Sequence, residues 1–131
     1  MPDDRPVPGS PEDWLRHAHA DLALARSPVG PDDLFELHCF HAQQAVEKSL
    51  KAILLKRGLR IPRTHVIQSL LDALSAVMVV PDDVVAASSL TLYASEVRYP
   101  RTEEPVTEEE LEESLRLADV VEAWAIGIVR Q

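Results

Sequence analysis

Apolar residues recur at the spacing of an α-helix in four separate parts of the chain. The series are Trp14, Ala18, Leu22 and Ala25; Cys39, Ala42, Val46, Leu50 and Ile53; Val66, Leu70, Leu71, Leu74 and Val77; and Leu111, Leu115, Ala118, Val121, Ala125 and Ile128. Each series lies on one face of a helix, as in amphipathic helices that pack against a core. The chain also holds only four glycines. This pattern predicts an all-α protein.

Capping and helix-breaking residues set the limits of the first two helices. Ser10 followed by proline is a typical helix start, and the first helix is expected over about residues 11–27. Asp32 or Asp33 is expected to cap the second helix, after a stretch that contains a glycine and two prolines. Gly58 is expected to end this helix, since glycine readily adopts the left-handed conformation found just past helix ends.

The remaining boundaries predict three further helices. Thr64 is expected to cap the third helix, and Pro81 begins the fourth, which should run to about Val97. Thr107 and Glu110 form a T-x-x-E capping box before the fifth helix. These helices, joined by short connectors, predict an up-and-down antiparallel helical bundle of about five helices, with the second and fifth as its spine.

Length and composition favour one domain. Residues 1–9 are polar and proline-rich and are expected to form a flexible tail, so the single bundle domain covers residues 10–131. The one cysteine, Cys39, forms no intrachain disulfide, and the fold therefore needs no oxidising compartment. The sequence shows no signal peptide and no stretch of about 18 apolar residues, so no membrane association and a cytoplasmic location are expected.

Charge is unevenly distributed along the chain. The net charge of −9, taken alone, argues against a nucleic-acid partner. Six lysines and arginines nevertheless lie within residues 48–63, which contain no acidic residue, whereas residues 103–113 contain seven glutamates. Such blocks can bind two different partners, or each other across a dimer. Both can equally be solvated faces, and the sequence leaves these alternatives open.

One face of the second helix carries an unusual set of polar residues. His41, Gln44, Lys48 and Lys51 follow at spacings of three, four and three, and this face is here called the polar stripe. In one interpretation the polar stripe is partly buried at a dimer seam or a cleft, where Gln44 and Lys48 need hydrogen-bond partners. In the other it is a solvated face with one histidine at the edge of the core.

The histidines do not form a convincing metal site. His38 and His41 have a workable ligand spacing on a helix, but no histidine or glutamate follows at the next turn. A third ligand such as His65 would have to come from another segment. The sequence also lacks the phosphate-binding loop, the dinucleotide-binding fingerprint and the G-x-S-x-G nucleophile motif. We therefore expect no metal and no cofactor.

The segment YASEVRYPR, residues 93–101, places an arginine beside a stiff Tyr-Pro pair. The guanidinium group of Arg98 can bind a phosphate or a carboxylate with two parallel hydrogen bonds. Alternatively, Arg98 is a cation that stabilises the end of the fourth helix, with Tyr99 packing beside it.

Three separated blocks of the chain together resemble the HEPN family. They are FHAQQAVEKSLKAIL, then PRTH before an apolar helix, then Y-x-x-x-x-R-Y-P before the last helix. The resemblance covers roughly residues 12–128. It implies an up-and-down helical bundle, a homodimer, and a minimal nucleotidyltransferase as partner in a toxin–antitoxin type of module. Many HEPN proteins resemble metal-independent RNases, whose motif is an arginine followed four to six residues later by a histidine.

This sequence departs from the RNase motif of the family. Arg98 stands where the arginine is expected, but residues 99–105 read YPRTEEP and contain no histidine. Arg60 and His65 match the bare spacing, yet they lie in the connector before the third helix. Since cleavage through the 2′-hydroxyl needs a general base and a general acid, His41 or His65 would have to replace the missing histidine.

Three functional hypotheses follow. The first is a nucleotide- or nucleic-acid-binding, dimeric partner of a minimal nucleotidyltransferase. Its ligand-binding residues are His41, Gln44, Lys48, Lys51, Arg98 and Tyr99. The second is a metal-independent RNase toxin in which Arg98 is catalytic and a histidine outside the motif is the base. The third is a non-catalytic helical scaffold without a ligand.

Overall fold

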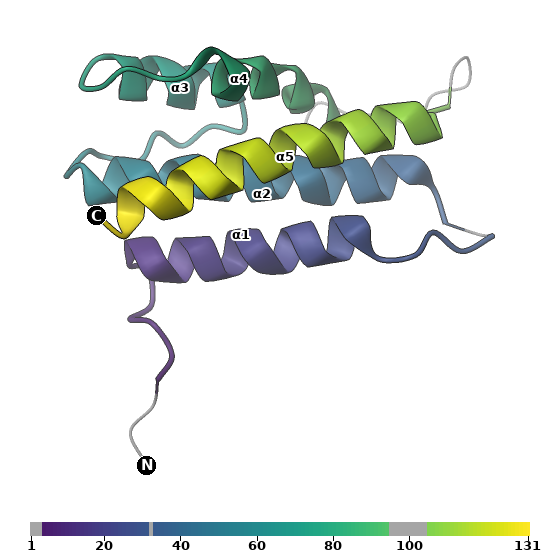
Figure 1. The fold of residues 1–131 in the computed structure, drawn as a ribbon, viewed down its shortest axis with the longest axis horizontal. Helices are drawn as coiled ribbons and strands as arrows, with labels where there is room; N and C mark the ends of the chain where they lie inside the picture. The colour runs from purple at the N-terminus through teal and green to yellow at the C-terminus, as the bar shows by residue number, and fades with distance from the viewer. Residues whose placement is uncertain (1–3, 32, 95–104) are drawn as a thin grey trace.

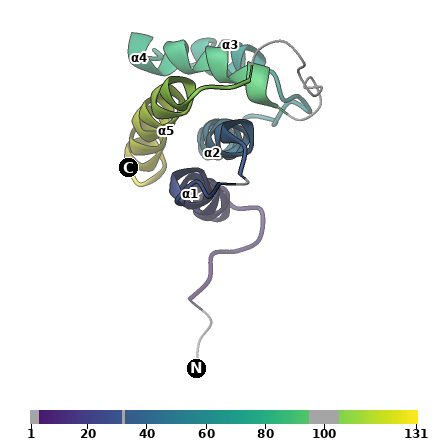
Figure 2. The same cartoon turned by 90° about the vertical axis from the view of Figure 1, so that its right-hand side faces the viewer.

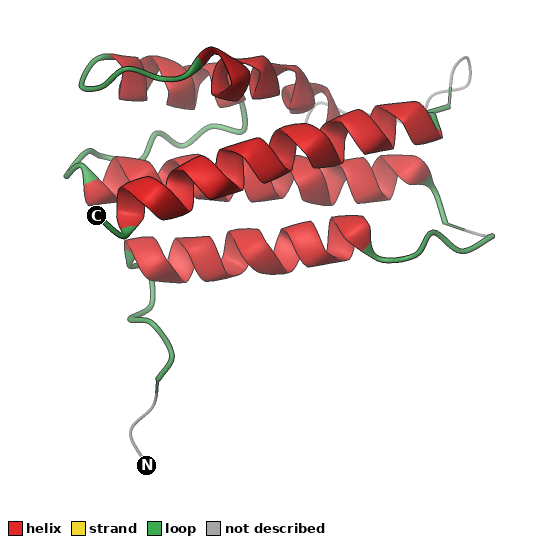
Figure 3. Ribbon diagram, in the orientation of Figure 1, coloured by secondary structure: helices red, strands yellow, loops and turns green. Residues whose placement is uncertain are grey.

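The fold is a bundle of helices, and no strand occurs in residues 4–31, 33–94 and 105–131, which the computed structural model describes (Figures 1 and 3). The elements are α1 (Pro11–Arg26), α2 (Phe35–Lys56), α3 (Ile67–Ser75), α4 (Asp82–Val85), a 3₁₀ helix η1 (Ala86–Tyr93) and α5 (Glu108–Val129). The predicted all-α bundle is confirmed. None of the helices in these residues is long and apolar enough to cross a membrane.

Helix α2 is the centre of the bundle. It packs against α1 and α5 along its length, and against α3 and η1 on a further side. Viewed near the helix axes, α2 lies between α1 and the layer formed by α3 and α4, with α5 beside it (Figure 2). The predicted apolar arc of α2 is confirmed as core, because all five of its members are fully buried: Cys39, Ala42, Val46, Leu50 and Ile53.

Contacts between the long helices fix their directions. Glu12 at the start of α1 pairs with Arg130 just past the end of α5, and His38 near the start of α2 contacts the carbonyl of Ala25 near the end of α1. Helix α1 is therefore antiparallel to both α2 and α5, which run in the same direction (Figure 1). Consequently the start of α5 and the end of α2 lie at opposite ends of the molecule.

Several helix ends form as the sequence predicts. The hydroxyl of Ser10 accepts a hydrogen bond from the amide of Asp13, which caps α1. The capping box of α5 is complete, since Thr107 and Glu110 each accept a bond from the other's backbone amide, at 3.2 and 3.1 Å. Gly58 adopts a positive φ of 75° after the last turn of α2.

Two predicted caps are wrong in detail. The N-cap position of α2 is occupied by Leu34, whose side chain makes no capping bond. Asp33 instead accepts a hydrogen bond from the amide of Gly30 at 2.7 Å. Asp32 is outside the described residues. The N-cap position of α3 is occupied by Val66, whose side chain makes no capping bond. Its amide donates to the hydroxyl of Thr64. Short polar side chains bind nearby backbone amides in turns as readily as at helix ends, so a turn competes with a cap.

The predicted fourth helix, from Pro81 to about Val97, is wrong in form up to residue 94, and residues 95–97 lie outside the described residues. A single short stretch of α-helix gives way to η1, which continues to Tyr93. The buried residues explain this change, because they recur at every third position: Val84, Ala87, Leu90 and Tyr93. A 3₁₀ helix has three residues per turn and therefore keeps such a series on one face, whereas an α-helix would rotate it away from the core.

We predict that Leu90→Ala lowers the free energy of unfolding by about 2–5 kcal/mol, because the side chain is 2% exposed and its loss leaves a cavity. Leu92, two residues away in η1, is 45% exposed and provides a matched control. Leu92→Ala should lower stability by less than about 1 kcal/mol. Urea denaturation measures both, and equal losses would contradict the threefold burial pattern.

Candidate functional site on the central helix

The polar stripe of α2 lies half-buried, against α1 and the connector before α3. The exposed fractions of the side chains fall along it, from 33% for His41 to 25% for Lys48 and 12% for Lys51. Such exposure is too low for a solvated face. The stripe is therefore a polar layer inside the fold, and its groups are paired with side chains of α1 and of α2 itself.

Asp21 of α1 binds two members of the stripe. Its carboxylate accepts hydrogen bonds from His41 Nδ1 at 3.0 Å and from Lys48 Nζ at 2.6 Å, and it is 11% exposed itself. Because a carboxylate only accepts, the imidazole proton of His41 sits on Nδ1. The second ring nitrogen, Nε2, has no partner among the described residues and is the group that His41 can offer to a ligand.

Glu47 is the buried centre of a second set of contacts. Its side chain is 3% exposed, and its carboxylate binds Lys51 Nζ at 2.6 Å, Gln43 Nε2 at 2.8 Å and His65 Nδ1 at 3.1 Å. Burial by itself raises the pKa of this carboxyl, but the hydrogen bonds from Lys51 and Gln43 outweigh it and hold the pKa below 4.5, its ordinary value. Glu47 is therefore ionised at neutral pH.

The remaining contacts join the stripe into one network. The ammonium group of Lys51 also lies 5.6 Å from the ring centroid of Trp14 in α1, a cation–π contact. Gln44 donates to the side-chain carbonyl of Gln43 at 2.6 Å. The prediction that Gln44 and Lys48 find hydrogen-bond partners is confirmed. Both lysines of the stripe are already neutralised by carboxylates, which weakens their attraction for an external anion.

Sequence reasoning missed the acidic partners. Glu47 and Lys51 are four residues apart on a helix, a spacing typical of ion pairs, so this partner was open to detection. Asp21 carries a weaker signal, as a lone acidic residue inside the apolar series of residues 14–25. His65 joins the network only through the tertiary fold, because 18 residues separate it from Glu47.

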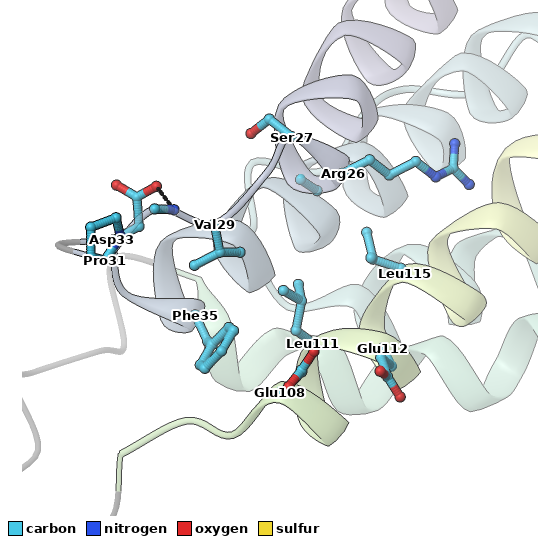
Figure 4. Close-up of a pocket in the computed structure, with 12 residues that line it drawn as sticks. Arg26, Ser27, Val29, Pro31, Asp33, Phe35, Glu108, Leu111, Glu112 and Leu115 are labelled. Atoms are coloured by element: carbon cyan, nitrogen blue, oxygen red, sulfur yellow. Dashed lines mark hydrogen bonds between the residues drawn. The ribbon is translucent and has the colours of Figure 1, made fainter.

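A separate cavity of about 570 Å³ lies between the end of α1 and the starts of α2 and α5 (Figure 4). Its apolar lining includes Val29, Phe35, Leu111 and Leu115. Its charged lining includes Asp33, Glu108 and Glu112, while the guanidinium group of the lining residue Arg26 pairs with Asp119. The three carboxylates repel phosphates, so a nucleotide or nucleic acid does not fit this cavity.

The comparisons with known proteins identify the family. The model of the HEPN domain matches residues 11–129 of the chain. This chain belongs to the HEPN family.

Two solved structures share the HEPN fold with this chain. TT1696 from Thermus thermophilus is 35% identical, with a TM-score of 0.78, and the match covers 90% of this chain and 97% of the other. ST0689, an archaeal HEPN homologue, is 28% identical, with a TM-score of 0.73 over 92% of this chain and 98% of that one. No curated protein gives a significant match. The similarity spans nearly the entire bundle.

Only some of the predicted site residues are among the residues that the structure describes. His41, Gln44, Lys48 and Lys51 lie together on α2, whereas Arg98 and Tyr99 are outside the described residues. Within the described ranges, no group of three or more His, Cys, Asp or Glu side chains is placed to hold a metal ion. Cys39 is buried, as predicted, and accepts a weak hydrogen bond from Ser114 Oγ at 3.6 Å.

We predict that Glu47→Gln lowers the free energy of unfolding by about 3 kcal/mol at pH 7, because it leaves the largely buried Lys51 without its counterion. Since the folded state lowers the pKa of Glu47, the stabilising effect is complete above about pH 4.5 and declines as the pH falls. The difference between wild type and variant should therefore narrow in acid, as measured by denaturant unfolding between pH 7 and pH 3.

A matched control is Glu113→Gln. Its partner Arg116 likewise lowers the pKa of Glu113, but this pair lies on the surface of α5, where solvent screens it. We expect this variant to unfold almost like the wild type. A loss as large as that of Glu47→Gln would mean that burial does not set the importance of these pairs.

Proposed function

We propose that this HEPN protein is a nucleotide- or nucleic-acid-binding subunit that forms a dimer and acts with a minimal nucleotidyltransferase, in a toxin–antitoxin type of module. The observation that carries the proposal is the sequence after Arg98, which keeps the arginine of the family's RNase motif but has no histidine four to six residues later. Cleavage of RNA through the 2′-hydroxyl depends on such a base. In the proposal, the chain without this histidine binds RNA and does not cleave it.

The internal pairing of the polar stripe refines the expected ligand contacts. Lys48 and Lys51 are neutralised by Asp21 and Glu47, so they position neighbouring groups rather than supply net positive charge. His41 Nε2 remains able to make a hydrogen bond to a ligand. In the proposal, Arg98 binds the anionic group and Tyr99 lies beside it.

Exposed leucines next to the stripe support the dimer. Leu24, Leu34 and Leu37 are each more than half exposed, and Leu24 and Leu37 line a shallow cavity of about 210 Å³ together with His41. Exposed apolar groups gathered on one face are typical of an association surface. We propose that the dimer forms through this face of α1 and α2.

One observation favours RNase activity as a second candidate function. Asp21 fixes the ring of His41 by its Nδ1 and leaves Nε2 outward, the arrangement in which a carboxylate orients a general base. His41 would then replace the missing motif histidine, with Arg98 stabilising the charge on the phosphorus.

An assay for RNA cleavage separates the two functions. The purified protein is incubated with mixed tRNA and mRNA in the absence of metal, beside Arg98→Ala and His41→Ala. We expect no cleavage by the wild type, and co-purification with a nucleotidyltransferase encoded beside it. Cleavage that disappears in both variants would make the protein an RNase and would overturn the proposal.

The dimer is tested by light scattering. We expect a mass near twice the 14.6 kDa of the chain, and a shift toward 14.6 kDa in Leu37→Glu, because a charge would be buried in the interface. Val79→Glu is the control, since Val79 is 90% exposed in the loop after α3 and should leave the mass unchanged. A wild type that stays at 14.6 kDa at every concentration would rule out the dimer.

A further inference from the structure

The lysines and arginines of this protein differ sharply in whether a carboxylate already neutralises them. Among the described residues, Arg16, Arg26, Lys48, Lys51, Arg116 and Arg130 each form an ion pair. Arg5 also makes an interaction. The described cations without any such partner are Lys56, Arg57, Arg60 and Arg63, and all four side chains are exposed. They lie within eight residues, here called the basic connector (residues 56–63).

Backbone and packing contacts hold the basic connector against the end of α2. Gly58 turns the chain after α2, with the amide of Leu59 bonded to the carbonyl of Leu54 at 2.8 Å. Leu59, Ile61 and Pro62 are half-buried, and Leu59 packs against the core. Arg60, between Leu59 and Ile61, and Arg63, which follows Pro62, are exposed to solvent. Just beyond, His65 is bound to Glu47, which attaches the connector to α2.

The chemistry of the connector suits a phosphate backbone better than a protein surface. Three of its four cations are arginines, whose forked guanidinium groups bind phosphates with two parallel hydrogen bonds. It contains none of the large exposed hydrophobic side chains found elsewhere in the described residues. Protein interfaces need such apolar anchors at their centre, and aromatic groups that could stack on bases are also missing here.

The position of the connector favours the binding of an anion. The glutamates at the start of α5 lie at the opposite end of the bundle, because α2 and α5 run in the same direction (Figure 1). The C-terminus of α2 contributes a partial negative charge of about half a unit, which four full positive charges outweigh. A polyanion is therefore repelled at one end of the molecule and attracted at the other.

We propose that the basic connector is a second nucleic-acid-binding surface of this protein, separate from the contacts proposed for Arg98 and His41, and that it holds the sugar-phosphate backbone of RNA without reading the bases. This inference rests on the proposed function and adds the surface and the mode of binding. It also assigns different tasks to the two cationic parts of the chain. The lysines of the polar stripe stabilise the fold, and the connector binds the polyanion.

The test compares two triple variants that change the net charge equally, from −9 to −12, since each replaces three arginines by neutral residues. The first, Arg57→Gln with Arg60→Gln and Arg63→Gln, removes the arginines of the connector. The second, Arg16→Gln with Arg116→Gln and Arg130→Gln, removes arginines that already have carboxylate partners. Binding of fluorescein-labelled poly(U) and poly(A) is measured by anisotropy from about 50 to 200 mM salt, after circular dichroism has shown that both variants are folded.

The four phosphate contacts of the connector contribute about −2.8 to the slope of log K against log salt on a single strand. The connector variant keeps one of these contacts, so its slope should be less steep by about 2.1, and its affinity at the lowest salt concentration should drop at least about tenfold. The paired-arginine variant should stay within about threefold of the wild type. Poly(U) and poly(A) should bind with similar affinity, since no base is read.

Three results would overturn the inference, and each has a different meaning. If the connector variant binds RNA like the wild type, the surface is misplaced but the proposed function stands. If the wild type binds no RNA at any salt concentration, the nucleic-acid part of the proposed function fails as well. If the connector variant binds RNA like the wild type and also no longer co-purifies with the nucleotidyltransferase, the connector is a docking surface for an acidic protein.

Discussion

A buried carboxylate holds this bundle together at its centre. Glu47 lies on α2 almost out of contact with solvent, and its ionised form is stabilised by groups from its own helix and from the connector before α3. Lys51, its nearest partner, also lies over Trp14 of α1. A single charge thus couples three segments that are far apart in sequence. Because a buried charge is costly unless it is paired, an arrangement that separated Glu47 from these partners would be destabilised.

The long helices could be predicted from the sequence because their signals are local. Apolar spacing and capping residues such as Thr107 act within a few residues of each other. The error in the fourth helix has another origin, since Val84, Ala87 and Leu90 are selected by the surface they pack against rather than by helix propensity. For the site, the polar face of α2 could be predicted from the spacing of its residues. The pairing of Lys48 with Asp21 could not, because it depends on how α1 packs against α2.

Whether each charged side chain is paired says more about function than the net charge of the chain. A net charge of −9 argues against RNA as a partner, and the cations of the polar stripe argue for it. The pairing of the side chains reverses both arguments. The positive charges of the stripe are neutralised internally by Asp21 and Glu47, whereas those of the basic connector have no carboxylate partners among the described residues.

The placement of the lysines has a consequence for chemical modification. The chain has only three, Lys48, Lys51 and Lys56, all on α2. Two have their amines held by carboxylates at 2.6 Å, and their side chains are largely buried, which shields these amines from a reagent. Lys56, at the exposed end of the helix, is thus the side-chain amine most open to acylation. A label or crosslinker attached there would report on the end of the bundle while leaving the buried network intact.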